Sequence, residues 1–150
     1  FVLHQEIHAH DYWTYELSFF YLNHCYLAIS SLEKLELYSY ADTSFKKHQT
    51  IEGNFLSFAF SPQADILALI TGDGCLKIYE WKNDVLKPQA DSPLQIKEKI
   101  KAIKFSQNGE FFIMVLQNNV VKIYEFLDKK FILLQQLTHE ENDYFFIKLY

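Results

Sequence analysis

The residues best placed for chemistry lie near the start of the chain, in the stretch HQEIHAHD from His4 to Asp11. His4, His8 and His10 would share one face of an extended strand, where imidazoles two residues apart can hold one zinc ion. Glu6 or Asp11 could add an oxygen ligand. A zinc site also needs a closed ligand set and supporting hydrogen bonds, so we favour a polar outer strand with solvated histidines. The sequence therefore predicts no metal ligand.

Other catalytic signatures are absent from the sequence. There is no Gly-rich phosphate loop, no G-x-S-x-G elbow and no H-E-x-x-H motif. Cys25 and Cys75 form no C-x-x-C pair and have no neighbouring base, which indicates free thiols inside the cell, although a single disulfide stays open. We therefore expect no enzyme, no catalytic residue and no cofactor. The alternative is a metal-using enzyme with most of its active site outside this segment, to which His8 and His10 would contribute a ligand.

Composition narrows the classes of partner. The 150 residues carry a net charge of −5, and all fourteen basic residues are Lys. Because Arg supplies the planar fork that binds phosphates and base edges, its absence argues against nucleic acid as a partner. No apolar run is long enough to span a bilayer, so membrane insertion is not expected.

The chain writes Lys-Ile-Tyr-Glu twice, in CLKIYEW (75–81) and in VVKIYEF (120–126). Extending the match in both directions places residues 55–81 over residues 100–126, and a more divergent third copy lies at 15–40. Each copy reads as strand, turn, strand, turn, strand, with Asp73-Gly74 and Asn118-Asn119 suited to tight hairpins. Fourth strands are expected at TSFKKHQT, PLQIK and FILLQQL, and Pro88 and Pro93 suggest a surface loop between Lys82 and Ser92.

Four antiparallel strands every 40–45 residues are typical of a β-propeller blade. A β-sandwich also has short strands at regular spacing, but it has no reason to reuse the same short motifs in the same order. The sequence therefore predicts an all-β fold, a β-propeller segment of four-stranded antiparallel blades that form an incomplete ring.

The repeats resemble those of the WD-repeat propeller family. That family often shows an apolar-x-Phe-Ser-Pro-x-Gly strand, a Ser/Thr-x-Asp-Gly turn, and a strand that ends in Trp-Asp. The resemblance implies a divergent propeller, because Tyr-Glu stands here in place of Trp-Asp and the family's Gly-His pair is absent. The matching structural positions are Phe60, Ser61, Thr71, Asp73, Gly74, Tyr79 and Glu80 in the middle copy, Phe105, Ser106, Tyr124 and Glu125 in the last, and Tyr38 in the first.

On this pattern residues 1–150 are part of one propeller domain. The predicted blades span 13–50, 54–97 and 100–137. Residues 1–7 read as the last strand of a preceding blade, and residues 143–150 as the first strand of a following one. Three blades cannot close a ring around a channel, so we expect this chain to be a segment of a longer protein that supplies the other blades. The alternative is an open arc that another chain completes.

The resemblance implies a non-catalytic scaffold that binds other proteins as subunits of an intracellular assembly. Within that class we lean to cytoskeletal or ciliary complexes, with a membrane-trafficking coat as the alternative and peptide recognition at the central channel as a third interpretation. The loop at 82–93 is the first candidate for a contact surface, because long ordered loops are often functional. The acidic run at 139–144 could receive a basic partner, but such a run is more often a solvated connection.

Overall fold

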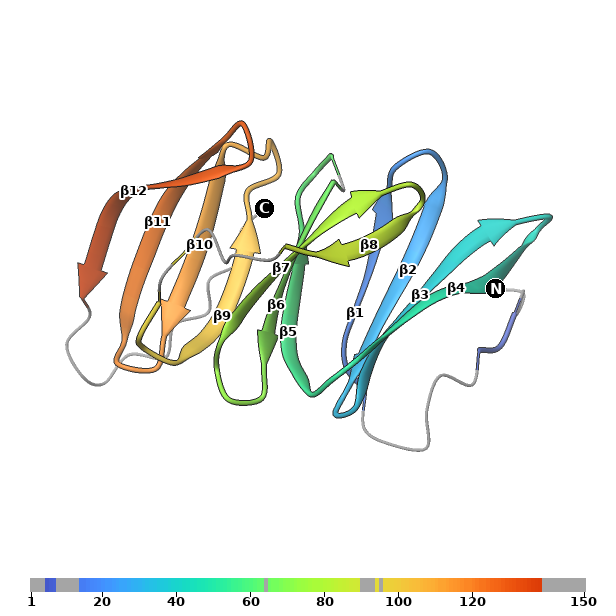
Figure 1. The fold of residues 1–150 in the computed structure, drawn as a ribbon, viewed down its shortest axis with the longest axis horizontal. Coiled ribbons are helices and arrows are strands. Elements are labelled where there is room, and N and C mark those ends of the chain that lie inside the picture. Colours follow the sequence, from blue (N-terminus) through green and yellow to red (C-terminus); the bar gives the residue numbers. More distant parts are fainter. Residues whose placement is uncertain (1–4, 8–13, 64, 90–93, 95, 139–150) are drawn as a thin grey trace.

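The structure is a computed structural model that describes residues 5–7, 14–63, 65–89, 94 and 96–138. Within these residues it contains twelve strands and no helix. No helix among the described residues is therefore long and apolar enough to cross a membrane. The strands form three four-stranded antiparallel sheets that lie side by side in a row (Figure 1). This arrangement confirms the predicted all-β class and the incomplete propeller.

Each sheet is built from four strands that are consecutive in sequence, and we call the sheets blades 1, 2 and 3. Blade 1 holds β1 (Thr14–Tyr21), β2 (Cys25–Ser31), β3 (Lys34–Ala41) and β4 (Ser44–Glu52). Blade 2 holds β5 (Phe55–Phe60), β6 (Ile66–Thr71), β7 (Leu76–Lys82) and β8 (Val85–Pro88). Blade 3 holds β9 (Ile100–Phe105), β10 (Phe111–Leu116), β11 (Val120–Leu127) and β12 (Lys130–Thr138).

The fourth strand of each blade follows a two-residue hairpin turn in which both residues take positive φ. These turns are Asp42-Thr43, Asn83-Asp84 and Asp128-Lys129. Such turns match the twist of the strands that they join. They also correct the sequence analysis of the middle blade, because β8 occupies Val85–Pro88 where a surface loop was expected, and PLQIK (93–97) is no strand within its described residues. The Asn83-Asp84 pair is a stronger turn signal than the prolines. Reliance on Pro88 and Pro93 placed the fourth strand of this blade too late in the sequence.

Two expectations at the chain ends concern residues that the structure describes only in part or not at all. Residues 5–7 are described and lie in no strand, whereas residues 1–4 and 143–150 are outside the described part. The strands expected at 1–7 and 143–150, and the blade limits drawn from the sequence, therefore stay predictions.

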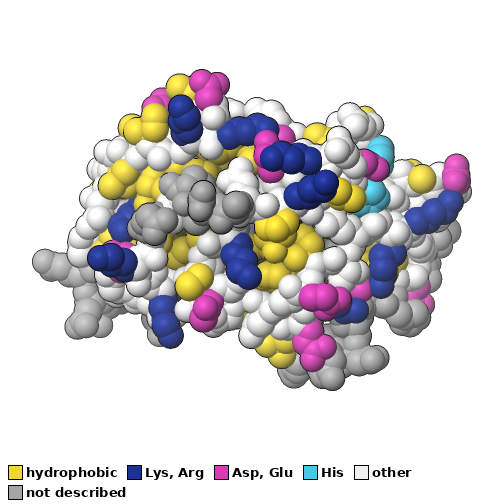
Figure 2. Space-filling view, viewed as in Figure 1, with side chains coloured by type: hydrophobic (Ala, Val, Ile, Leu, Met, Phe, Trp, Pro, Cys, Tyr) yellow, Lys and Arg dark blue, Asp and Glu magenta, His cyan; other side chains and the backbone are white. Residues whose placement is uncertain are grey.

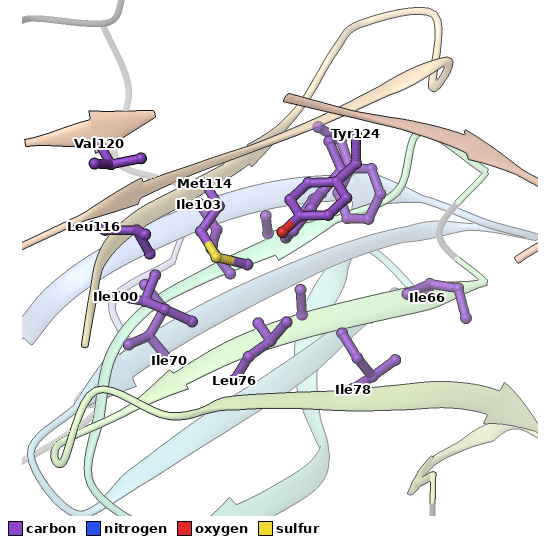
Figure 3. Close-up of a cluster of buried hydrophobic side chains, with 14 residues drawn as sticks. Ile66, Ile70, Leu76, Ile78, Ile100, Ile103, Met114, Leu116, Val120 and Tyr124 are labelled. Atoms are coloured by element: carbon purple, nitrogen blue, oxygen red, sulfur yellow. The ribbon is translucent and has the colours of Figure 1, made fainter. Parts of the chain in front are cut away.

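Two apolar clusters hold the three sheets together. The first lies between blades 1 and 2, and the second lies between blades 2 and 3, where Figure 3 shows Ile70, Leu76 and Ile78 facing Ile100, Met114 and Tyr124. The members of the first cluster are Ala28, Leu35, Leu37, Ile51, Phe55, Phe58, Leu67, Leu69, Tyr79 and Leu86. The members of the second are Ala59, Ile66, Ala68, Ile70, Leu76, Ile78, Ile100, Ile103, Phe105, Phe112, Met114, Leu116, Val120 and Tyr124.

Successive residues of a strand point to opposite faces of its sheet, so each blade has one face toward the previous blade and one toward the next. In β7, Tyr79 packs in the cluster shared with blade 1, whereas Ile78 packs in the cluster shared with blade 3. We call these two sides of a blade its preceding face and its following face. Strand β6 is buried on both sides, which explains its continuous apolar sequence ILALIT.

Equivalent isoleucines in blades 2 and 3 provide a test of this packing. Ile78 is only 3% exposed, whereas Ile123, at the same repeat position, is partly exposed. In the 150-residue chain we expect Ile78→Ala to lower the free energy of unfolding by about 2–5 kcal/mol, because it leaves a cavity between two sheets. Ile123→Ala should cost clearly less. Urea denaturation of the two variants measures both values, and equal losses would contradict the assigned faces.

Candidate functional site

The Phe-Ser positions close the turn between the first two strands of blades 2 and 3. The Ser61 hydroxyl donates to Asp65 Oδ1 at 2.8 Å and accepts the N–H of Ile66 at 3.2 Å. The Ser106 hydroxyl donates to Asn108 Oδ1 at 2.7 Å and accepts the N–H of Phe111 at 2.9 Å. Each serine is therefore bound within its own turn, and its role there is structural. The preceding phenylalanines of the motif, Phe60 and Phe105, pack in the inter-sheet apolar clusters.

The Thr-x-Asp-Gly positions form the hairpin between β6 and β7. The Thr71 hydroxyl donates to Asp73 Oδ1, and the Cys75 N–H donates to the same oxygen at 3.3 Å. The hydrogen bond from the threonine hydroxyl is the main cause that holds the pKa of Asp73 below its usual value, and the hydrogen bond from the Cys75 N–H is the next. Gly74 has φ +83°, and a Cβ at this residue would lie 2.9 Å from Lys99 Cβ, so the turn requires glycine.

Glu80, which stands at the aspartate position of the family motif, joins blade 2 to blade 3. Its carboxylate accepts from Lys129 Nζ at 2.5 Å and from Lys82 Nζ at 2.5 Å. Lys129 lies in the hairpin turn before β12, and it also approaches Asp65 at 3.6 Å. The hydrogen bond from Lys129 is the main cause that holds the pKa of Glu80 below its usual value, followed by that from Lys82.

The tyrosines at the tryptophan position are buried in all three blades. Burial is the largest cause that raises the pKa of Tyr38, Tyr79 and Tyr124 above that of a free phenol. Among the described residues, only the blade 1 motif tyrosine meets a buried carboxylate: the Tyr38 hydroxyl donates to Glu36 Oε2 at 2.8 Å. The fully buried Glu36 side chain also pairs with Lys34 at 2.9 Å and with Lys47 at 2.7 Å.

An aromatic junction that the sequence analysis missed joins the outer parts of blades 1 and 2. Tyr26 meets Trp81 edge to face at 5.1 Å, and His48 stacks on Trp81 at 5.7 Å between ring centroids. Asp84 binds two of these side chains: its carboxylate accepts from the Tyr26 hydroxyl at 3.3 Å, and its carbonyl oxygen lies 2.8 Å from His48 Nε2. Burial, then the Asp84 charge, raises the pKa of Tyr26 to about 12. His24 also stacks on Tyr26, with 4.5 Å between ring centroids.

A second missed contact joins the first strands of blades 1 and 2. Glu16 Oε2 accepts from the Ser57 hydroxyl at 2.9 Å and from the Phe58 N–H at 3.0 Å. Glu16 and Ser57 lie 41 residues apart in the sequence, and neither belongs to a recognised motif position. No local pattern could have predicted that they meet.

The alternative of a metal site has no support in the described part of the chain. Among those residues no group of three or more His, Cys, Asp and Glu side chains is arranged to hold a metal ion. His4, His8, His10 and Asp11, and the acidic run at 139–144, lie largely or wholly outside the described residues. In Figure 2 hydrophobic side chains form patches across the visible face with Lys side chains among them, and the histidines form one group beside an acidic side chain.

Exposed apolar side chains concentrate on the two end sheets. On β1 the side chains of Leu17, Phe19 and Tyr21 are 63%, 60% and 68% exposed. On β12 the exposed apolar residues are Ile132, Leu133, Leu134 and Leu137. Large exposed apolar patches are uncommon on soluble monomers and mark surfaces that contact other protein. The preceding face of blade 1 and the outer part of blade 3 are therefore the candidate contact surfaces.

The Glu80 ion pairs predict a difference in acid sensitivity between equivalent positions. A carboxyl group whose pKa falls on folding contributes stability above its unfolded pKa and loses it as the pH falls through the folded pKa. We therefore expect Glu80→Gln to remove up to about 1 kcal/mol of stability at pH 7, and progressively less as the pH falls through the lowered pKa of the folded carboxylate.

Glu125→Gln is the matched control, because Glu125 forms no ion pair with any described residue. Thermal unfolding from pH 3 to pH 7 measures both variants. A Glu80 variant with the same pH profile as the Glu125 variant would show that the inter-blade ion pair does not stabilise the fold.

The buried Glu36 makes Tyr38 more sensitive to loss of its hydroxyl than the other motif tyrosines. Tyr38→Phe leaves one carboxylate oxygen without its 2.8 Å donor, so we expect a loss of about 1–3 kcal/mol in the free energy of unfolding. Tyr124→Phe should cost little, because the Tyr124 hydroxyl donates no hydrogen bond to a described residue. Urea denaturation decides the matter, and equal costs for the two variants would refute this role of Tyr38.

Solved structures with the same fold include two bacterial proteins, each at 15% sequence identity. One is a protein from Lactobacillus plantarum, with a TM-score of 0.59, which matches 81% of this chain and 42% of its own. The other is described as a "putative 6-phosphogluconolactonase" from Bacteroides fragilis, with a TM-score of 0.62, and the match covers 83% of this chain and 39% of that chain. The chain thus spans about two fifths of the length of each structure.

These structures correct the expectation that the chain is no enzyme. The expectation is wrong because it treats a missing catalytic set as excluding an enzyme, whereas a protein described as a lactonase has the same fold. The loops of several blades can build one active site, so three blades without a catalytic set do not exclude catalysis. At 15% identity the likeness shows the fold alone, and it transfers no activity to this chain.

Sequence comparisons give a more specific result. No curated protein matches the chain. The family model of the anaphase-promoting complex subunit 4 WD40 domain matches residues 58–148, which include most of blade 2 and all of blade 3. This match covers more than half of the chain and confirms the WD-repeat resemblance. The chain therefore belongs to the anaphase-promoting complex subunit 4 WD40 domain family.

Proposed function

We propose that this chain is a protein-interaction platform and that its partners are the other subunits of an anaphase-promoting complex. The observation that carries the proposal is the family match over residues 58–148, since the matched family is named for a subunit of that complex. Multi-subunit assembly is the part of the sequence expectation that this match supports. Nothing in the match supports the cytoskeletal or ciliary lean, or the trafficking coat.

The surface of the chain supports a protein partner in preference to nucleic acid. The net charge is −5 and the chain contains no Arg, which disfavours binding to phosphates. Apolar side chains on β1 and β12 are about half exposed or more. Rigid sheets that display apolar side chains suit protein–protein contacts, in which buried apolar area supplies most of the binding free energy. We place the platform inside the cell, where Cys25 and Cys75 remain free thiols, as they are in the structure.

Affinity purification of the full-length protein from its own cells tests the proposal. We expect the tagged protein to recover subunits of the anaphase-promoting complex in constant proportions, with the tag alone as the control for background. Recovery of a stable set of ciliary, cytoskeletal or coat proteins would replace the proposed assembly. Recovery of no stable partner would refute the platform itself.

A further inference from the structure

In two places the carboxamide of a glutamine binds both main-chain groups of a single residue. Gln5 Nε2 donates to the carbonyl oxygen of Phe45 at 2.9 Å, and the Phe45 N–H donates to Gln5 Oε1 at 2.7 Å. Gln49 Nε2 donates to the carbonyl oxygen of Leu86 at 2.9 Å, and the Leu86 N–H donates to Gln49 Oε1 at 2.9 Å. A primary amide offers a donor and an acceptor side by side, as a neighbouring strand does. We call this arrangement a carboxamide clamp.

The two clamped residues occupy the same position in their blades. Phe45 is the second residue of β4, where it lies opposite Tyr40, and Leu86 is the second residue of β8, where it lies opposite Trp81. Each is one residue beyond the pair that closes the hairpin turn, so its N–H and C=O point away from the sheet. The clamp therefore satisfies the free edge of an outer strand, and the Gln49 clamp does so from the adjacent blade.

The glutamine that supplies a clamp also recurs in the repeat. Gln49 lies opposite Leu37, directly after a β-bulge in β4. Gln135 lies opposite Ile123, the repeat equivalent of Leu37, directly after a β-bulge at the same place in β12. Gln89 occupies this position in blade 2 without a bulge, and its carboxamide bonds to no described residue of β12. Blade 3 thus repeats both the glutamine and the bulge of the blade that forms a clamp.

Gln135 points to the following face of blade 3, and its carboxamide has no hydrogen-bond partner among the described residues.

The side chains on the following face of blade 3 are less buried than the side chains at the same repeat positions of blades 1 and 2. The five following-face residues of blade 1 are at most 1% exposed, and the five of blade 2 are at most 8% exposed. In blade 3 only Val121 is as well buried, while Phe111 is 37% exposed and the other three are partly exposed. The equivalent sets are Tyr26, Ala28, Ser30, Leu35 and Leu37; Ile66, Ala68, Ile70, Leu76 and Ile78; and Phe111, Ile113, Val115, Val121 and Ile123.

We propose that Gln135 is a main-chain-binding residue whose carboxamide clamps the N–H and C=O of one residue in an outer strand. The occupant of this face is a further four-stranded antiparallel sheet of the same polypeptide, packed on Phe111, Ile113, Val115 and Ile123. This assignment continues the series of interfaces within the chain, in which the following face of one blade meets the preceding face of the next. It does not depend on which assembly the protein joins.

Hydrogen–deuterium exchange of the full-length polypeptide, resolved to single amides, tests the clamp directly. Gln49→Leu is the positive control, and it should accelerate exchange of the Leu86 amide by about fivefold, as expected for loss of one hydrogen bond. Gln135→Leu should accelerate, by a similar factor, one amide in an outer strand that follows residue 138. Gln136→Leu is the matched negative control, because Gln136 is also exposed but lies opposite Lys122 and points to the other face of β12.

Two further readouts keep the result decisive. Gln135→Glu retains an acceptor for the target N–H, so it should accelerate the same amide less than Gln135→Leu does, even if the leucine variant is less stable overall. An exchange profile of Gln135→Leu identical to that of Gln136→Leu would overturn the clamp. Acceleration of an amide in blades 1 to 3, or in a different subunit, would overturn the assigned occupant.

Discussion

Burial of each sheet on both faces is the constraint on which the rest of the structure depends. A four-stranded sheet with apolar residues on both faces is stable only if another layer covers each of them. Strand β6 shows the consequence, since all its residues except the terminal Thr71 are buried between blades 1 and 3. The row of sheets in Figure 1 is the arrangement that covers every internal face by a sheet of the same kind.

Apolar packing alone does not set the offset between neighbouring sheets, because it is not directional. Polar contacts between blades supply that direction. Glu16 binds Ser57 and the Phe58 main chain near the first strands, while Glu80 binds Lys129 near the hairpin turn before β12. Surface ion pairs contribute little stability, but each of these directional contacts restricts the relative position of the two sheets that it joins, blades 1 and 2 for Glu16 and blades 2 and 3 for Glu80. The aspartate position of the repeat thus acts between blades as well as within one.

The features that recur locally could be predicted from sequence, and the long-range ones could not. The spacing of Phe60, Tyr79 and their equivalents predicted three sheets of four strands, because periodicity reports the faces of a strand directly. The position of β8 was wrong because two prolines outweighed the Asn83-Asp84 turn. Contacts such as that of Tyr26 with Asp84, 58 residues away, leave no local signal. The exclusion of catalysis failed for a related reason, since active sites in this fold draw on several blades.

The divergence of the repeat motif is compatible with a stable fold because apolar packing and strand pairing hold the sheets together. Tyr replaces Trp in every blade, yet Tyr38, Tyr79 and Tyr124 are all at most 8% exposed. The Tyr38 hydroxyl donates to the buried Glu36 carboxylate, whereas the Tyr79 and Tyr124 hydroxyls donate to no described residue. The three blades therefore share mainly apolar volumes at these positions, while their exposed turns and end faces differ in sequence and remain available for the contacts of the proposed platform.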